Sequence, residues 1–485
     1  MGIFRSNDPA AFDDLDGIVV DETAPPSSIQ GARTNVVILV GHFERGPHTL
    51  EPMGSIGEVQ EAYGANSTYS GLKQLKSKKF GALKIIRIEA GSSAKGTLTL
   101  DDAGAVDTLK FDAKYKGVYG NSIQVKVEAG TTTGKKYTIK DTSATAVLPQ
   151  EVYDNVTIAT VASLGTFSES RLVDATVLST AAEPANVAFT ALASGSDGTV
   201  ADADYQAAIA KAEVEGAGNF LFLDSYNDVR NGYLKVHAAA TEDKMVICAN
   251  SESATTATAV SDALSDVASL RDSAGRIIYA FNEPKTNING VDEFTSPASW
   301  AASVLSQTGP NIDPSFAANT QFLAGITSLK HTLTRTQFIA LKDAGIMAFE
   351  FDSDIGYKIK SGIVTQIADS SKITVLRRRM ADFLTNSAAR FMKAYQGAVN
   401  SKDNRTAVNG AIRGFVATQE GLGVLPKDSE VKGGKAKLVD TESANTDLTI
   451  GQGMFIIIWK QRIYSSMRYI VLRAQIGETV VVTEE

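Results

Sequence analysis

The chain of 485 residues has one cysteine, Cys248, and only four histidines. A single thiol excludes a framework of intrachain disulfides and any cluster of thiolate ligands. The histidines show no HExxH motif and no other paired spacing. We therefore expect neither a metal site nor a cofactor.

Long apolar runs and an excess of basic residues are also missing. The run MFIIIW near the end is too short to span a bilayer, and the acidic start has no apolar region typical of a secretion signal. The net charge of -8 argues against direct binding of nucleic acid, because that affinity comes from Lys and Arg displacing counterions. We expect a product that stays in the cytosol unless an assembly carries it elsewhere.

The composition is that of a soluble globular protein, with 43% hydrophobic and 21% charged residues, and the length predicts two to four domains. Residues 1–33 are acidic, interrupted by prolines, and contain one β-type island, GIVV; this pattern indicates an extended arm or a frayed tail. The rest divides by pattern into a globular stretch (34–90), a β-rich stretch (91–200), an alternating α/β stretch (201–298), and helices and hairpins from 299 onward.

The segment LTRTQFIALKDAG carries the most complete helix punctuation in the chain. Thr334 is the expected N-cap, Gln337 closes a capping box, and Gly345 ends the helix. The segment SIGE, residues 55–58, predicts a second capping box before a short helix.

The stretch NVVILVGHFERGPHTLEPMGSIGEV, residues 35–59, has the strand, turn and helix order of a phosphate-binding loop. Its glycines do not give G-x-G-x-x-G, and Pro47 and Pro52 interrupt the turn. The segment GTTTGKK, residues 130–136, is one residue short of a Walker loop and is followed by a strand, so a β-hairpin turn explains it better.

Polar residues follow three predicted strands of the α/β stretch: Asp224, Asn250 and Asn282. Ligands bind at this end of the strands in doubly wound sheets, but polar residues also cap the following helices. No G-x-S-x-G elbow is present. An α/β enzyme with a cleft near Asp224 and Asn250 remains an alternative hypothesis.

A long helix is predicted from Val375 to Gln396. At 100° per residue its apolar residues fall on one side, and a mainly basic stripe crosses the other: Arg379, Asn386, Arg390 and Lys393. The stripe indicates either a solvated face or a docking face for an acidic partner.

Several segments, in order along almost the whole chain, resemble the contractile tail sheath proteins of myophages and related injection machines. DGIVVDETAPPSSIQGARTNVVILVGHFERGP resembles the opening arm and first strand of that family. AKYKGVYGNSIQVKVEAG is similar to its A-x-x-x-G-x-x-GN-x-I-x-V-x-V stretch, and LASGSDGTVADADYQAAI to its L-x-G-G-x-DG lead into a helix. VTQIADSSKITVLRRRMADFL resembles the arginine-rich helix of Mu-like sheaths.

The resemblance implies a multidomain α+β and α/β fold. An α/β sheath core would be built from N- and C-terminal parts (34–90 and 299–475), with an inserted β-rich domain (91–200), an α/β domain (201–298) and extended arms (1–33 and 476–485). The arms would add strands to a sheet in neighbouring subunits, through Ile18, Val19, Val20, Val480, Val481 and Val482. On this reading the stretch 35–59 is architecture and not an active site.

The resemblance also implies a function without catalysis or nucleotide hydrolysis. The subunit would polymerise as stacked hexameric rings around a tail tube, assemble in the bacterial host cytoplasm, and contract in the virion tail to drive the tube through the host envelope. Expected partners are further copies of the chain, the tube protein, and baseplate and tail terminator proteins. The candidate tube contact is Arg377, Arg378, Arg379, Arg390 and Lys393. A sheath from a secretion system or a headless bacteriocin particle is a second alternative.

Overall fold

The computed structural model of the chain describes residues 3–4, 18–19, 29, 31–214, 219–241, 243–369, 372–431 and 435–465. The chain divides into two compact units, one of residues 31–387 and one of residues 1–30 with 388–485. We describe each unit by itself.

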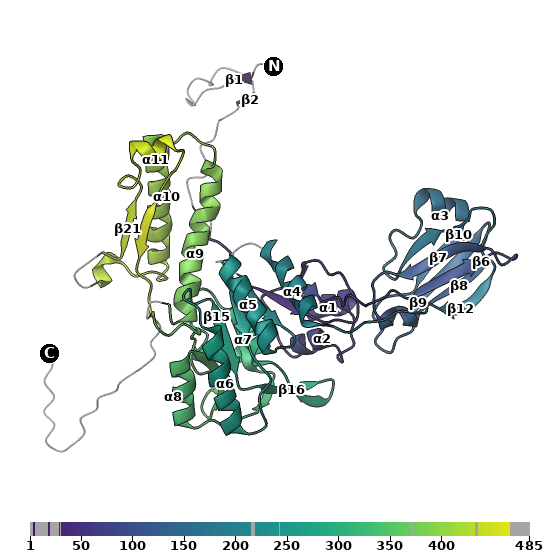
Figure 1. Cartoon of the computed structure of the whole chain (residues 1–485). Helices are drawn as coiled ribbons and strands as arrows, with labels where there is room; N and C mark the ends of the chain where they lie inside the picture. The colour runs from purple at the N-terminus through teal and green to yellow at the C-terminus, as the bar shows by residue number, and fades with distance from the viewer. Residues whose placement is uncertain are drawn as a thin grey trace. The chain divides into compact units, whose positions relative to one another are not determined.

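The larger unit is organised around one eight-stranded sheet (Figure 1). Its order is β20-β19-β15-β14-β13-β3-β5-β4, and the six strands from β19 to β5 run parallel. The edge strands β20 and β4 are antiparallel to their neighbours. The strands are β3 (Val36–Gly41), β4 (Glu51–Met53), β5 (Ala82–Arg87), β13 (Asn219–Leu223), β14 (Met245–Cys248), β15 (Ile277–Phe281), β19 (Ile346–Asp352) and β20 (Gly356–Ile359).

Helices cover both faces of this sheet. Alternate residues of β3 point to opposite faces, so Val37 and Leu39 join one core while Ile38 and Val40 join another. The first core is covered by α1 (Ile56–Tyr63), α2 (Ser70–Leu75) and α7 (Pro297–Gln307), and the second by α4 (Asp202–Lys211), α5 (Asp228–Thr241), α6 (Thr256–Leu270) and α8 (Arg335–Ala344). The result is a doubly wound α/β layer structure.

This sheet differs from the predicted domain layout. Residues 34–90, 201–298 and part of 299–475 were expected in a core and a separate α/β domain, yet each supplies strands to the same sheet. The strands of 201–298 lie in the middle of that sheet, because β13 pairs with β3 over five residues. Backbone hydrogen bonds between strands far apart in the sequence therefore unite segments 34–90 and 201–298, which the sequence pattern assigned to different domains.

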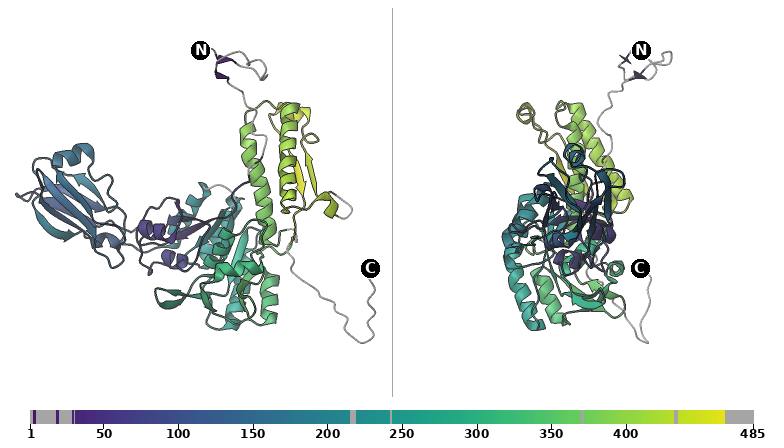
Figure 2. Two further views of the ribbon diagram at one scale, coloured as in Figure 1. Left: turned by 180° about the vertical axis from the view of Figure 1, so that it is seen from behind. Right: turned by 90° about the vertical axis from the view of Figure 1, so that its right-hand side faces the viewer.

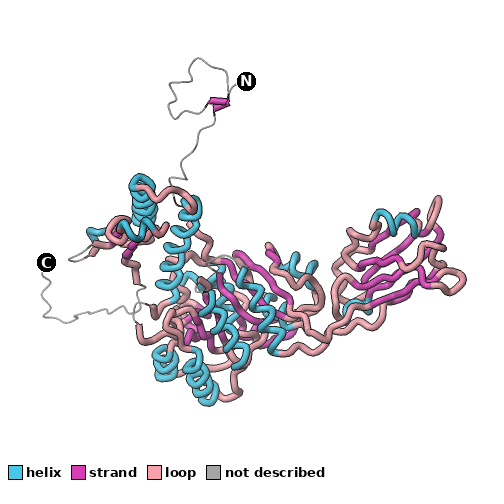
Figure 3. Tube along the Cα trace, turned by 45° about the horizontal axis from the view of Figure 1, so that its top comes forward, coloured by secondary structure: helices cyan, strands magenta, loops and turns pink. Residues whose placement is uncertain are grey.

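A β-sandwich is inserted between β5 and α4. A four-stranded sheet, β10-β9-β8-β12, and a three-stranded sheet, β11-β7-β6, enclose one apolar core. Figure 3 shows that strands predominate in this part of the chain. The strands are β6 (Thr97–Asp101), β7 (Asp107–Ala113), β8 (Ile123–Ala129), β9 (Lys135–Asp141), β10 (Glu151–Val156), β11 (Val173–Val177) and β12 (Val187–Ala191), with the short helix α3 (Ile158–Leu164) after β10.

A smaller sheet of order β17-β16-β18 lies after β15. Its strands are β16 (Pro284–Ile288), β17 (Val291–Phe294) and β18 (Ile326–Leu329). The long helix α9 (Val375–Met392) follows β20. Its residues up to Ser387 belong to the larger unit.

In the smaller unit, α10 (Lys402–Gly421) packs against β21 (Lys437–Asp440) (Figure 2). β21 pairs with β22 (Ile458–Gln461) in an antiparallel two-stranded sheet, and the short helix α11 (Asp447–Gly451) lies between them in the chain. Within the described residues neither strand has another strand partner.

Candidate functional site

The sheet changes direction between β3 and β13. From β3 the chain moves to β5 on one side, and it later returns to add β13, β14, β15 and β19 on the other side. In open α/β sheets this switch point, at the carboxyl ends of the strands, is where ligands bind. Asp224 follows β13 directly at this place, as the enzyme hypothesis requires.

The carboxylate of Asp224 is already occupied by the protein. Its Oδ2 accepts hydrogen bonds from His42 N (2.7 Å) and from the Ser70 hydroxyl, and its Oδ1 accepts one from the Tyr205 hydroxyl (2.8 Å). The residue is only 3% exposed. Desolvation by burial raises the pKa of Asp224, although the three donors act in the opposite direction.

The space beside this carboxylate is filled as well. A Cβ atom at Gly41 would lie 3.1 Å from the Asp224 Cβ, so glycine lets the side chain sit against β3. Asp224 thus links β3, β13, α2 and α4 at the position where a doubly wound enzyme would leave room for its ligand. This filled switch point argues against the enzyme hypothesis.

The two asparagines at the neighbouring strand ends have structural partners too. Asn250 donates to Asp228 and Asp266 (both 2.8 Å) and accepts from Asn231 (2.9 Å). Asn282, which is 1% exposed, donates to the carbonyl oxygens of His331 and Phe349 (both 3.0 Å). Asn250 thus joins the end of β14 to α5 and α6, and Asn282 joins the end of β15 to β19 and to the segment of His331; these contacts are structural, but they are not helix caps.

The stretch 35–59 forms β3, a turn, β4 and the start of α1. Arg87 donates to the carbonyl oxygens of Phe43 and Gly46 (both 3.3 Å) and so fixes the turn from inside the protein. Gly46 has φ +110°, a backbone conformation that favours glycine. The Ser55 side chain caps α1 by accepting from Glu58 N (3.2 Å). The turn is built from protein contacts, as the architectural reading predicts.

The glycine-rich segment 130–136 is the connection between β8 and β9, which pair in an antiparallel hairpin. Gly134 has φ +62°, and Gly130 N donates to the Gly134 carbonyl (3.0 Å). The predicted hairpin turn is confirmed.

Two motifs that carry the family resemblance meet where the β-sandwich joins the large sheet. Asn121 donates to the carbonyl of Gly195 (2.9 Å), and its Oδ1 accepts from Gly195 N (2.7 Å). Asp197 accepts from Val118 N (2.9 Å) and from the Tyr69 hydroxyl (2.8 Å). These contacts therefore join the chain segments that enter and leave the inserted β-sandwich to each other and, through Tyr69, to the α/β layer.

One residue of the predicted basic stripe, Arg379, is buried and does not lie on an exposed face. Arg379 is 2% exposed, and its guanidinium donates to Thr308 Oγ1 (3.0 Å) and to the carbonyls of Thr308 (2.6 Å) and Leu305 (3.2 Å). Carbonyl groups at a helix C-terminus lack partners within the helix, and Arg379 supplies them at the end of α7. Burial lowers its pKa to about 9. We therefore exclude Arg379 from the candidate tube contact.

The other residues of the candidate tube contact differ in their surroundings. Arg378 is half-buried and donates to Asp382 (Nε to Oδ1, 3.1 Å), a carboxylate that Arg276 also binds through two hydrogen bonds (2.9 and 3.0 Å). Arg377 is half-buried and has a partner of its own. Arg390 and Lys393 are exposed and belong to the smaller unit. The candidate contact is thus reduced to Arg390 and Lys393.

The predicted arm strands are only partly within the described residues. Ile18–Val19 forms β2, which pairs in parallel with β1 (Ile3–Phe4), whereas Val20 and Val480 to Val482 lie outside the described residues. The end of the predicted arm is fixed in the body: Ala32 is buried, and its N–H donates to Ser387 Oγ on α9 (2.9 Å).

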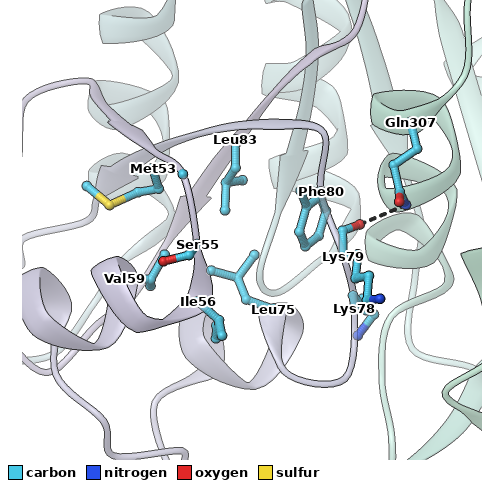
Figure 4. A pocket seen from close by; sticks show the side chains of 11 residues that line it. Met53, Ser55, Ile56, Val59, Leu75, Lys78, Lys79, Phe80, Leu83 and Gln307 are labelled. Carbon is cyan, nitrogen blue, oxygen red and sulfur yellow. Dashed lines mark hydrogen bonds between the residues drawn. The ribbon is translucent and has the colours of Figure 1, made fainter.

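Sequence reasoning missed two features that bear on function. The two-stranded sheet β21-β22 was not predicted. A pocket beside β4 with a buried lysine, Lys78, was also missed (Figure 4). No motif in the sequence could reveal it, because its walls come from separate segments.

None of the helices in the described part of the chain is both long and apolar enough to cross a membrane. No protein-family model and no curated protein sequence matches the chain. Comparison with solved structures does give matches. A sheath tail protein from Desulfitobacterium hafniense has 16% sequence identity and a TM-score of 0.63, with 92% of this chain and 100% of that chain covered.

Two further structures support the same conclusion. The sheath tail protein Lin1278 from Listeria innocua is 15% identical with a TM-score of 0.63, covering 85% of this chain and 90% of that one. The contracted helical sheath of the anti-feeding prophage is 13% identical with a TM-score of 0.59, covering 96% and 99%. Almost the full length of each solved chain is therefore matched, and the protein has the fold of contractile tail sheath proteins.

Proposed function

We propose that the chain is the structural subunit of a phage contractile tail sheath, which polymerises as helically stacked hexameric rings around a tail tube and contracts to drive the tube through a host envelope. The observation that carries this proposal is the fold similarity over 92% of this chain and all of a sheath tail protein. The filled switch point at Asp224 is consistent with a protein that works by assembly and not by catalysis.

The sheet β21-β22 is a suitable acceptor for strands from neighbouring subunits. Its two strands pair only with each other among the described residues, so the outer edge of β22 is the better place for another strand; on β21 the Val439 carbonyl already accepts from Arg413 Nη2 (3.1 Å). The arm segments around Ile18 to Val20 and Val480 to Val482 are the proposed donors. At about 0.5–1.5 kcal/mol per hydrogen bond, each added strand contributes several kcal/mol, and repetition in every subunit makes a continuous mesh.

The larger unit is built to move as one body during contraction. The β-sandwich and the α/β layer are joined by the Asn121 and Asp197 contacts and by an ion pair between Arg45 and Asp141 that is shielded from water. Rotation of near-rigid subunits linked by arms is an established form of large conformational change. No nucleotide hydrolysis is required for it.

The proposed tube contact is the pair Arg390 and Lys393, which are exposed near the end of α9. A contact made mainly by exposed charges is weak and is screened by salt. Such a contact suits a sheath that must release the tube when it contracts. The other proposed partners are the baseplate and tail terminator proteins, and the proposed location is the virion tail, after assembly in the bacterial host cytoplasm.

A sheath of a headless particle is a second candidate. The contracted sheaths of the anti-feeding prophage and of an extracellular contractile injection system (PVC) match 96% and 95% of this chain, each with a TM-score of 0.59. Particles purified from the producing cell would distinguish the two candidates: DNA-filled heads on the tails support the phage sheath, and headless tails support the other.

Negative-stain electron microscopy of the purified protein across a concentration series tests the shared proposal. Hollow striated tubes of uniform diameter are expected, because subunits joined by interfaces that do not close on themselves form open-ended helical polymers. Only discrete closed particles at every concentration would contradict it.

A further inference from the structure

A pocket lies beside β4 at the edge of the large sheet, and about half of its wall is apolar (Figure 4). Its volume is about 310 Å³, which falls in the range of about 300–1,000 Å³ found for small-molecule sites. The apolar wall is formed by Met53, Val59, Leu75, Phe80 and Leu83. Figure 4 shows Lys78 and Lys79 next to each other at the opposite side of the pocket from Met53 and Val59.

Lys78 is buried without a counter-ion. It is 8% exposed, and its Nζ lies 4.5 Å from the centre of the Trp300 ring and 3.5 Å from Thr295 Oγ1, at the limit of a hydrogen bond. No acid side chain among the described residues forms an ion pair with it. Desolvation by burial lowers the pKa of Lys78 to about 7.

Other buried cations of the larger unit have better partners. Lys244 lies 3.2 Å from a carboxylate oxygen of Asp243, and Arg45 lies 3.3 Å from one of Asp141. An ammonium group has three N–H donors, and Lys78 has one weak acceptor within reach. Burial of a charge in this way is costly unless another group supplies the missing partner.

We propose that this pocket binds a small carboxylate with an apolar tail, its carboxylate at Lys78 Nζ and its tail against the wall of Met53, Leu75, Phe80 and Leu83. A carboxylate gives the ammonium both an opposite charge and hydrogen-bond acceptors, and such charge-assisted bonds are stronger than those between neutral groups. The nearby Lys79 carbonyl cannot serve instead, because it already accepts from Ser303 Oγ (2.6 Å) and Gln307 Nε2 (3.0 Å). This site does not depend on the proposed sheath function.

Isothermal titration of the full-length, unassembled chain with octanoate tests the proposal. Wild type should bind octanoate saturably, and it should bind octanol, which has the same tail without the acid, at least about tenfold more weakly. Lys78→Met should weaken octanoate binding at least about tenfold, while Lys76→Met, which changes a nearby lysine outside the pocket lining, should leave it unchanged. Absence of saturable binding, or equal binding of octanoate by Lys78→Met, would overturn the proposal.

Acylation of amines by acetic anhydride near neutral pH, followed by peptide mass spectrometry, gives a second readout in the wild-type chain. Saturating octanoate should protect Lys78 from acylation and leave the labelling of Lys76, which does not line the pocket, unchanged. Unchanged labelling of Lys78 would overturn the proposal even if the Lys78→Met variant did not fold.

Discussion

Arg45 and Asp141 form an ion pair across the junction between the α/β layer and the β-sandwich, with 3.3 Å between Arg45 Nη1 and Asp141 Oδ2. The exposed fractions of the two side chains are only 1% and 0%. The Asp141 carboxylate also accepts from Ser122 Oγ (2.7 Å) and from Ser143 N (2.9 Å). Removal of one partner would leave the other charge buried without compensation.

We predict that Asp141→Asn lowers the free energy of unfolding by about 3–5 kcal/mol, because it leaves the buried Arg45 guanidinium without its counter-ion. Urea denaturation followed by circular dichroism measures this change. Asp174→Asn is the matched control in the same sandwich, since Asp174 pairs with Lys95 and Lys114 (both 2.9 Å) but its side chain is 45% exposed. The control should cost at most about 1 kcal/mol. Equal costs would contradict the role of the buried pair.

The pKa of Asp224 predicts a dependence of stability on pH. Because burial raises this pKa in the folded chain, ionisation of Asp224 favours the unfolded chain. Its stabilising effect is complete below the ordinary aspartate pKa of about 3.9 and is lost as the pH rises through the raised value. The side chain of Asp224→Asn does not titrate. The variant should therefore be least stable relative to wild type at low pH, and the difference should shrink as the pH rises.

Thermal unfolding of both chains at a series of pH values measures that difference. A difference that grows with pH would mean that Asp224 has a lowered pKa in the folded chain.

The contacts of Ala32 define where the N-terminal arm ends. Deletion of residues 1–28 should stop polymerisation and leave the body folded, because the deletion spares the hydrogen bond from Ala32 N to Ser387 Oγ. Deletion of residues 1–34 also removes this bond and should lower the melting temperature. Sedimentation and electron microscopy report polymerisation, and circular dichroism reports folding. Polymers formed by the shorter deletion would exclude the arm as the link between subunits.

Charge-reversal variants distinguish the role of the exposed Arg390 from that of the buried Arg379, both of which lie on α9. Arg390→Glu with Lys393→Glu should abolish co-assembly with tube protein and leave the melting temperature nearly unchanged, since both residues are exposed. Arg379→Glu should destabilise the chain by at least about 3 kcal/mol, because it places a carboxylate against the carbonyls of Leu305 and Thr308. Co-sedimentation with assembled tubes measures the first effect and urea denaturation the second. Normal co-assembly of the double variant would disprove the proposed contact.

Local signals in the sequence were sufficient for many individual elements. The helix α8 begins after Thr334, whose side chain accepts from Gln337 N, and it ends at Gly345 in the left-handed region, as the capping residues predict. Each apolar run of the α/β stretch is a strand. These features depend on neighbours within a few residues, so the pattern alone determines them.

Features that depend on distant contacts were not predictable. Helical periodicity placed Arg379 on a polar stripe, but it could not show that the end of α7 covers that side of α9. The helix α10 was missed although Val408, Ile412 and Phe415 are spaced for one buried face, because three glycines within it weaken the helical pattern. Lys78 is an ordinary lysine in the sequence, and only the packing of Trp300 against it makes it unusual.

The order of strands in the large sheet has a consequence for synthesis of the chain. β3 begins at residue 36, but the sixth parallel strand, β19, begins at residue 346. On the ribosome the outer edge of β15 must wait for β19 to emerge, and pairings over such long separations form slowly. Residues 388–485, which hold the proposed acceptor sheet, are made later still. The proposed acceptor sheet β21-β22 is therefore made only after every strand of the large sheet, whereas the proposed N-terminal donor arm is made first.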